Sequence, residues 1–167
     1  MWKVAIPAAI LALAAPATTG AQQIPMVKLR IEGIRSDEDA KAVMDALIHM
    51  PNAKVANRLT VRDPVVLVGP LQGAKWDLGQ LAQTVAEAKT PSRSKGVPSA
   101  SLILTCSAKR DEALARNLEA TCAKLKGVDA KKCKLDPKRK EVHIKLDDRG
   151  GAKWAEIKAA FPGLEPE

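Results

Sequence analysis

The tetrapeptide Gly-Ala-Lys-Trp occurs twice in this chain of 167 residues, at positions 73–76 and again at 151–154. A repeat of this period is longer than the roughly 20 to 50 residues of solenoid and propeller units. It therefore predicts two copies of one compact domain. An element predicted in one copy is expected at the matching place in the other.

The segments that precede the two tetrapeptides align at a spacing of 75 residues. Residues 50–53 align with 125–128, which places Gly127 on Asn52 at the ends of equivalent helices. The tetrapeptides themselves are 78 residues apart, so three residues have been added to the second copy. We place this addition near residues 136–138, in a turn.

Residues 1–21 have the pattern of a secretory signal peptide. Lys3 precedes an apolar run over 4–15, and small residues at 19–21 provide a cleavage site. The run is shorter than the roughly 20 apolar residues of a membrane-spanning helix, and an uncleaved N-terminal anchor is the alternative. We expect a mature protein that begins at Gln22, is periplasmic or secreted, and has no stable membrane span.

The remaining sequence divides into two domains and a linker. The first domain spans residues 22–90 and the second spans 101–167, while residues 91–100 are rich in Pro, Ser, Gly and Lys, as is typical of a linker. Each copy has about 65 residues, near the lower size at which one core is self-sufficient. Packing of the copies on each other, or a disulfide, would therefore help to stabilise the pair.

Hydrophobic patterning predicts the same mixed fold in both copies. Alternating apolar and charged residues over 27–31 predict a half-buried strand. Ser36 predicts the helix start that follows, because its hydroxyl can accept a hydrogen bond from the backbone N–H of Asp39. After this helix, the first copy has predicted strands at 54–61 and 65–68 and a helix at 75–87. The second copy has predicted strands at 102–106, 131–135 and 142–146 and helices at 111–126 and 153–160.

This order of elements predicts an α+β fold. In each copy a helix joins the first two strands, so the right-handed crossover rule makes them parallel, and the following hairpin can place the third strand between them. Both helices then cover one face of a small sheet, as in the βαββα part of a ferredoxin-like fold. A fourth strand is not evident in either copy. The predicted fold is two tandem ferredoxin-like βαββα(β) domains.

Two short segments resemble the heavy-metal-associated domain family. Residues 29–34, Leu-Arg-Ile-Glu-Gly-Ile, are similar to the strand that leads into that family's metal-binding loop, and residues 125–128, Leu-Lys-Gly-Val, are similar to the end of its helix. The resemblance covers most of both copies and implies the ferredoxin-like fold. It also implies metal binding, which in that family depends on a Cys-x-x-Cys motif.

This metal-binding motif is absent from both copies. Alignment on the helix ends places the family's two cysteine positions at Ser36 and Asp39, and at Asp111 and Leu114. Soft ions such as Cu(I) prefer thiolates, whereas hydroxyl and carboxylate groups are hard oxygen donors. We interpret Ser36, Asp39 and Asp111 as helix caps and assign no metal site. A metal-handling protein with non-standard ligands is the alternative.

The three cysteines, Cys106, Cys122 and Cys133, match no Cys-x-x-Cys or zinc-site spacing. Each lies on a core-facing position by periodicity, so we expect buried small side chains or, after export, a disulfide. The topology separates Cys106 from Cys133 by two strand spacings, about 9 to 10 Å, beyond the roughly 7 Å between bridged Cα atoms. Cys106 and Cys122 lie at opposite ends of the layer. Cys122 with Cys133 is the remaining pair.

The chain is basic, with a formal net charge of +8, and the excess is densest between residues 131 and 140. The basic side chains there are Lys131, Lys132, Lys134, Lys138, Arg139 and Lys140. Such a run is typical of a solvated hairpin, or of a surface that contacts an envelope protein or an anionic polymer. Nucleic acid is not expected as a partner, because the chain is predicted to be exported and has few aromatic side chains on which bases could stack.

The sequence offers little catalytic chemistry. It has two histidines and no tyrosine, and it has neither a Gly-x-Ser-x-Gly nor a His-Glu-x-x-His motif. Asp147 and Asp148 precede a Gly-Gly break and are typical of a turn. We therefore expect a non-enzymatic binding or interaction module with no catalytic residues and no cofactor.

Overall fold

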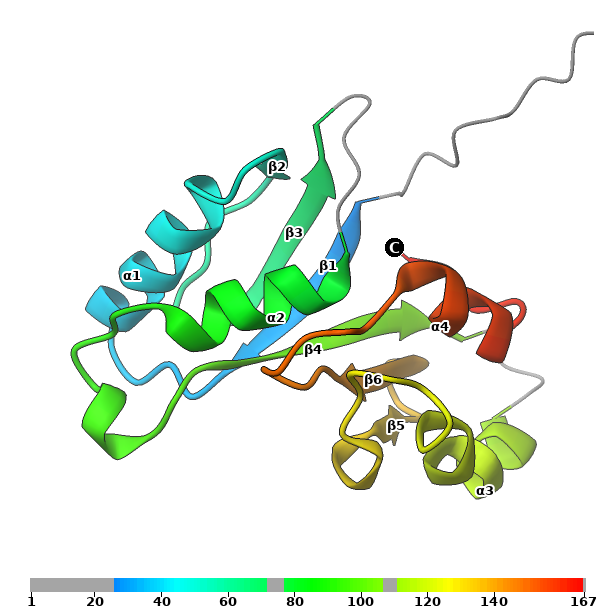
Figure 1. Cartoon of the computed structure of the whole chain (residues 1–167). Coiled ribbons are helices and arrows are strands. Elements are labelled where there is room, and N and C mark those ends of the chain that lie inside the picture. Colours follow the sequence, from blue (N-terminus) through cyan, green and yellow to red (C-terminus); the bar gives the residue numbers. More distant parts are fainter. Residues whose placement is uncertain (1–25, 72–76, 107–110, 167) are drawn as a thin grey trace, which may run out of the picture.

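The computed structural model describes residues 26–71, 77–106 and 111–166 of the chain (Figure 1). The expected signal peptide, residues 1–21, and the first tetrapeptide, residues 73–76, lie outside these ranges. Among the described residues, no helix combines the length and the apolar composition that a membrane crossing requires.

The secondary structure follows the order strand, helix, strand, strand, helix in each half of the chain. The strands are β1 (Val27–Glu32), β2 (Ala53–Val55), β3 (Val65–Pro70), β4 (Ser99–Thr105), β5 (Lys134–Asp136) and β6 (Glu141–Lys145). The helices are α1 (Asp37–Ile48), α2 (Leu78–Glu87), α3 (Asp111–Cys122) and α4 (Trp154–Ala160), with short 3₁₀ helices η1 (Arg93–Lys95) and η2 (Ala130–Lys132).

The strands form a six-stranded antiparallel sheet in the order β2-β3-β1-β4-β6-β5. In each half the third strand lies between the first two, so β3 separates β1 from β2, and β6 separates β4 from β5. β1 and β4 pair with each other, and Leu29 lies opposite Leu102. The α+β class is confirmed, and the two halves contribute to one continuous sheet, in which the expected division into two separate domains is not visible.

The pairing of β1 with β4 has a simple physical cause. A strand at the edge of a sheet leaves N–H and C=O groups without partners, and the described residues contain no fourth strand in either half. Each of these two strands therefore covers the edge of the other. Lys28 lies opposite Ile103, and these residues are 75 positions apart, so the halves are related by an approximate two-fold rotation.

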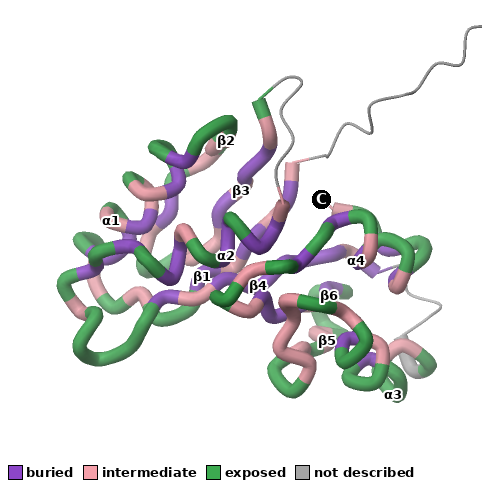
Figure 2. The backbone as a smooth tube through the Cα atoms, in the orientation of Figure 1, coloured by how far each residue is buried: buried purple, intermediate pink, exposed green. Residues whose placement is uncertain are grey.

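One apolar core lies between the sheet and the helices. Alternate residues of the central strands point into it and are fully buried. In Figure 2 the tube is coloured as buried along much of these strands. The strands contribute Val27, Leu29, Leu102 and Ile144, and the helices contribute Val43, Leu81, Leu118 and Ile157. Full burial of a side chain of this size contributes about 1.5 to 3 kcal/mol, and the core contains residues of both halves, so it helps to join them.

The opposite face of the sheet carries two ion pairs that also join the halves. Lys28 Nζ lies 3.2 Å from Glu141 Oε1, and Lys145 Nζ lies 2.6 Å from Glu32 Oε2. Both pairs pass across β4, since β1 and β6 are its two neighbours. His143 lies on this face as well, with Nε2 3.2 Å from Glu141 Oε2.

Equivalent contacts recur in the two halves at the end of the first helix. Asn52 and Gly127 both have left-handed backbones, with φ of 62° and 68°. The carbonyl of Asn52 accepts a hydrogen bond from the N–H of Leu71, and that of Gly127 accepts one from the N–H of Asp147, each at 2.8 Å. The chain therefore leaves the first helix of each half in the same way.

The three added residues of the second half lie before β5, and our placement of them near residues 136–138 is wrong. In the first half, Ala56 lies four positions after Asn52, and its N–H bonds to the carbonyl of Leu67. In the second half, the matching residue is Lys134, which lies opposite His143 and seven positions after Gly127. The extra residues form η2.

The tetrapeptide explains this error. α2 begins two residues after the end of the first tetrapeptide, whereas α4 begins at Trp154, the last residue of the second tetrapeptide. The hairpin from Lys134 to His143 is two residues shorter than the one from Ala56 to Leu67. The N-caps Asp77 and Lys153 are therefore 76 positions apart, not 78, and the two tetrapeptides stand at different distances from the helix starts. Trp154 is buried at the start of α4.

Other differences from the predicted boundaries also have local causes. The strand expected at 54–61 ends at Val55, because the side chain of Asn57 takes over the ladder: it donates to the carbonyl of Val65 at 3.0 Å and accepts from the N–H of Leu67 at 2.6 Å. α2 begins at Leu78 rather than at residue 75, since the Asp77 carboxylate caps it by accepting from the N–H of Gln80.

The expected linker at 91–100 is partly structured. β4 begins at Ser99, three residues earlier than predicted, because Ser99 and Ala100 pair with Glu32 and Ile31 of β1. In the second half the helix predicted to reach residue 126 ends at Cys122. The strand predicted at 131–135 is divided between η2 and β5.

Candidate functional site

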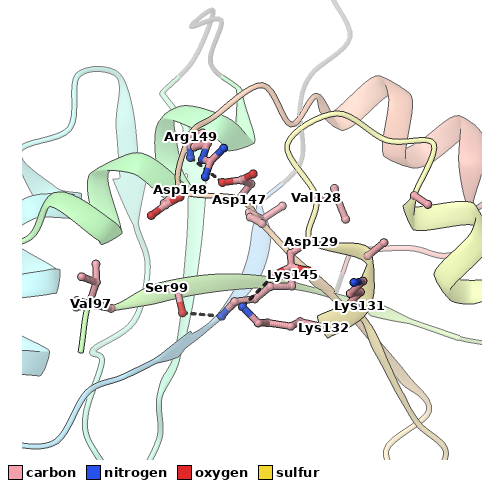
Figure 3. A pocket seen from close by; sticks show the side chains of 14 residues that line it. Val97, Ser99, Val128, Asp129, Lys131, Lys132, Lys145, Asp147, Asp148 and Arg149 are labelled. Atoms are coloured by element: carbon pink, nitrogen blue, oxygen red, sulfur yellow. Dashed lines mark hydrogen bonds and ion pairs between the residues drawn. The ribbon is translucent and has the colours of Figure 1, made fainter. Parts of the chain in front are cut away.

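A pocket of about 680 Å³ lies where the start of β4 meets the loops of the second half. It is lined by residues 97–99, 128–132 and 145–149, together with Ala123. Figure 3 shows η2 with Lys131 and Lys132 on one side and the turn with Asp147, Asp148 and Arg149 on another. The pocket therefore combines the segment that precedes β4 with the added residues of the second half.

Backbone hydrogen bonds hold the walls of the pocket in place. The N–H of Asp129 donates to the carbonyl of Lys145 at 2.9 Å, and Val128 forms an isolated bridge with Leu146. The turn that follows β6 is closed by Asp147, whose Oδ1 accepts from the N–H of Arg149 at 3.0 Å. This confirms that the two aspartates belong to a turn, which here also lines a pocket.

Four basic and three acidic side chains face the pocket. Lys145 is the most buried of the basic groups, with 8% of its side chain exposed, and its ammonium bonds to Glu32 and to Ser99 Oγ, both at 2.6 Å. Burial opposes ionisation of Glu32, but the hydrogen bond and charge of Lys145 outweigh it, so the pKa of Glu32 lies below its usual value. Lys145 is thus committed to joining β6 to β1.

Two of the carboxylates are also engaged. Lys132 Nζ lies 3.0 Å from Asp129 Oδ2, and this hydrogen bond raises the pKa of the lysine. The hydrogen bond from the N–H of Arg149 lowers the pKa of Asp147, although burial opposes the shift. Within the described residues, the ammonium of Lys131 and the guanidinium of Arg149 make no salt bridge. These two cations are the groups most available to a ligand.

The basic run singled out in the sequence does not form one patch. Lys131 and Lys132 line the pocket, whereas Lys138, Arg139 and Lys140 occupy the turn at the other end of the β5–β6 hairpin, where Arg139 Nε lies 4.0 Å from Asp136 Oδ2. Lys134 is exposed on β5 between them.

Sequence reasoning missed Lys145 and Arg149, which the fold brings to the same pocket as Lys131 and Lys132. The sequence feature that could have indicated this site is the addition of three residues to the second half. Its correct position, between Gly127 and Lys134, is visible only once the strand register is known.

The positions that align with the family's metal-binding cysteines have structural roles in the first half. The Ser36 hydroxyl accepts from the N–H of Asp39 at 3.2 Å, which confirms the predicted cap, and the Asp39 carboxylate accepts in return from the N–H of Ser36. Asp39 is fully buried and also accepts from the N–H groups of Arg35 and Ser92. Its bond from Ser92 ties the start of α1 to the expected linker.

These hydrogen bonds determine the charge state of Asp39. The N–H of Ser92 contributes most, burial opposes it, and the bonds from Arg35 and Ser36 add to it, so the pKa of Asp39 lies below its usual value. In the second half, Leu114 packs against the core, while the side chain of Asp111 lies outside the described part of the chain. No group of three or more His, Cys, Asp or Glu side chains with the geometry of a metal site occurs among the described residues.

None of the three cysteines, all of which lie in the described ranges, is part of a disulfide. Cys106 and Cys122 are buried and Cys133 is partly exposed, packed against the core. The side chains of Cys122 and Cys133 are in hydrogen-bonding contact. The pair selected from the predicted topology is therefore brought together by the fold.

Comparison of the chain with protein-family models, with curated proteins and with solved structures gives no match. The resemblance to the heavy-metal-associated domain family thus depends on the residues quoted above.

Proposed function

We propose that this chain is an exported, non-enzymatic binding module, periplasmic or secreted, whose two halves are tandem, degenerate ferredoxin-like units of the heavy-metal-associated type. The strand order in each half supports the choice of unit, since the third strand lies between the first two. The signal-like residues 1–21 support export.

The observation that carries the binding proposal is the pocket beside η2. The residues of η2 have no counterpart in the first half, so the framework that the halves share does not require them. Here the added residues form a wall of a 680 Å³ cavity and bring Lys131 and Lys132 to it. Cavities of this size are typical of ligand sites.

The charges favour an anionic ligand, such as an acidic segment of an envelope protein or an anionic polymer. Asp129 and Asp147 are engaged with Lys132 and with the N–H of Arg149, which leaves Lys131 and Arg149 to face a ligand, with Asp148 as the remaining acidic group. Arginine binds carboxylates in a two-pronged geometry, and lysine acts as a point charge.

A charge-reversal comparison tests this proposal. Binding of poly-L-glutamate to the Lys131→Glu/Arg149→Glu double variant should be about tenfold weaker than to the wild type at low salt, because two attractive contacts become repulsive. The Lys138→Glu/Lys140→Glu variant has the same net charge but alters the far end of the hairpin, and its affinity should change about threefold or less. Fluorescence anisotropy measures both.

Three other outcomes would contradict the proposed contact at Lys131 and Arg149. Equal losses in the two variants would mean that net charge alone attracts the polymer, and a larger loss in the Lys138→Glu/Lys140→Glu variant would place the contact on the hairpin turn. Binding that neither variant affects would exclude both surfaces.

Calorimetry of the mature protein with Cu(I), Zn(II) and Ni(II) distinguishes the metal-handling alternative from the proposed function. We expect no stoichiometric site of sub-micromolar affinity, because the aligned positions are occupied by the Ser36–Asp39 cap, by Asp111 and by Leu114, and none of these is a thiolate. A stoichiometric, sub-micromolar isotherm with any of these ions would replace the present proposal.

A further inference from the structure

Two thiols from different elements meet beside the pocket. Cys122 is the last residue of α3 and is fully buried, and Cys133 directly follows η2. Their side chains are in hydrogen-bonding contact, and Cys133 Sγ also donates to the carbonyl of Asp129 at 3.5 Å. Cys106, the third thiol, is buried just after β4.

The chain between Cys122 and Cys133 forms one wall of the pocket. Ala123 and residues 128–132 all line it. The backbone bonds from Lys132 to Asp129 at 3.0 Å and from Cys133 to Ala130 at 3.2 Å close η2, while the bond from Asp129 to Lys145 ties the segment to β6. A bond between its two ends would therefore restrict the wall directly.

We propose that Cys122 and Cys133 form a disulfide in an oxidising compartment, and that this disulfide fixes the wall of the pocket that carries Lys131 and Lys132. The inference goes beyond the proposed binding function, because it does not depend on which ligand the pocket takes. It shares with that function only the expected export.

The surroundings of the two thiols assign an order to the reaction. The hydrogen bond from the Cys122 thiol lowers the pKa of Cys133, burial opposes this, and the backbone N–H of Lys145 adds to the lowering. The same hydrogen bond raises the pKa of Cys122, and burial raises it further. Cys133 is also the more exposed of the two thiols, whereas Cys122 is buried. A donor therefore reaches Cys133 first, which makes it the attacking thiolate and Cys122 the resolving thiol.

The oxidant is a disulfide-containing donor, such as oxidised glutathione or a thiol–disulfide oxidoreductase. Cys133 loses its proton and attacks one donor sulfur, which forms a mixed disulfide and releases the other donor sulfur as a thiol. Cys122 then loses its proton and attacks Cys133 Sγ, which expels the second donor thiol. Two thiols of the protein are oxidised and one donor disulfide is reduced to two thiols.

Mass spectrometry of the full-length mature protein, treated with oxidised glutathione, tests the bond. The oxidised protein should be about 2 Da lighter than the reduced protein. Peptide mapping without reduction should recover Cys122 linked to Cys133, with Cys106 alkylated as a free thiol. Recovery of Cys122 and Cys133 as free thiols, or a bond that includes Cys106, would overturn the inference.

Thermal unfolding tests the effect on the fold. A disulfide that closes a loop of this length should raise Tm by about 10 °C relative to the same protein kept reduced. The Cys133→Ser variant should show no difference between the two conditions, while Cys106→Ser should respond as the wild type does. Hydrogen exchange of amides 123–132 should be faster in the reduced wild type. Equal Tm and equal exchange in both redox states would contradict the role assigned to the bond, whether or not poly-L-glutamate binds.

Discussion

The two halves of this protein share a framework and differ at η2, which forms one wall of the pocket in the second half. Both follow the same order of strands and helices, and both leave the first helix through a left-handed residue whose carbonyl accepts an equivalent hydrogen bond. After that residue the second half adds η2, and its chain at 150–152 packs closely against Gly127. The comparison shows that the repeated residues maintain the fold, whereas the pocket depends on what one half changed.

Gly127 allows residues 150–152 of the second half to pack this closely. A Cβ atom at this position would lie 2.3 Å from the backbone nitrogen of Ala152. The equivalent residue of the first half is Asn52, which has the same sign of φ and carries a side chain. Glycine therefore permits both the left-handed turn and the close approach, whereas asparagine permits only the turn.

The largest expected effect comes from exchanging these two residues between the halves. Gly127→Asn should destabilise the protein by about 4 kcal/mol, because the new side chain collides with backbone that cannot move without disturbing the turn. Asn52→Gly should cost less than about 1 kcal/mol, since glycine adopts the same φ. Urea unfolding of both variants measures the difference, and similar losses would show that the halves do not differ here.

A smaller effect is expected where the first half contacts the second. Gly79 at the start of α2 donates its N–H to the carbonyl of Ala152 at 3.2 Å, and a Cβ there would lie 2.4 Å from the nitrogen of Gly151. Gly79→Ala should therefore destabilise by about 2 kcal/mol, although alanine is the better helix former. Gln80→Ala, on the exposed side of the same turn, is the control. A stabilised Gly79→Ala variant would show that this contact between the halves is loose.

The third prediction concerns the cap that the first half builds with Asp39. The folded-state pKa of Asp39 lies below its usual value of 3.8, so its stabilising contribution is complete above that value and is lost as pH falls through the folded-state pKa. Asp39→Asn should be clearly destabilised at neutral pH, and the deficit should shrink below about pH 4. A deficit independent of pH, measured by chemical unfolding, would contradict the assignment of charge to these hydrogen bonds.

The smallest effect is expected at the ion pairs that bridge the halves. Glu32 is about half exposed, with 49% of its side chain accessible, so solvent screens its attraction to Lys145. Glu32→Gln should cost about 0.5 kcal/mol at low salt and less at high salt. A loss above about 2 kcal/mol would mean that Lys145 depends on this carboxylate far more than its exposure suggests.

Much of the framework could be predicted from the sequence because its signals are local or repeated. Ser36 and Asp39 stand at capping-box spacing, alternation marks β1, and the helix between the first two strands determines that they are parallel. The contact between Cys122 and Cys133 also followed, since it depends on strand spacing rather than on side-chain detail.

The pocket could not be predicted, because it depends on register. Lys131 and Arg149 are separated by β5, β6 and two turns. The bridge between Val128 and Leu146, and the hydrogen bond from Asp129 to Lys145, bring their segments to one cavity. The shared tetrapeptide predicts the wrong place for the added residues, because its two occurrences are not at equivalent positions in the fold. The bond from Ser92 to Asp39 was also beyond reach, because nothing local marks a contact across 53 positions.

The joining of β1 to β4 also determines which strands lie at the edges of the sheet. It places long strands at the centre of the sheet and leaves β2 and β5, each of three residues, at its rims. Such brief rims offer a neighbouring chain little backbone on which to extend a sheet. The pairing of β1 with β4 thus covers a long edge of each half and leaves only short edges for contact with other chains.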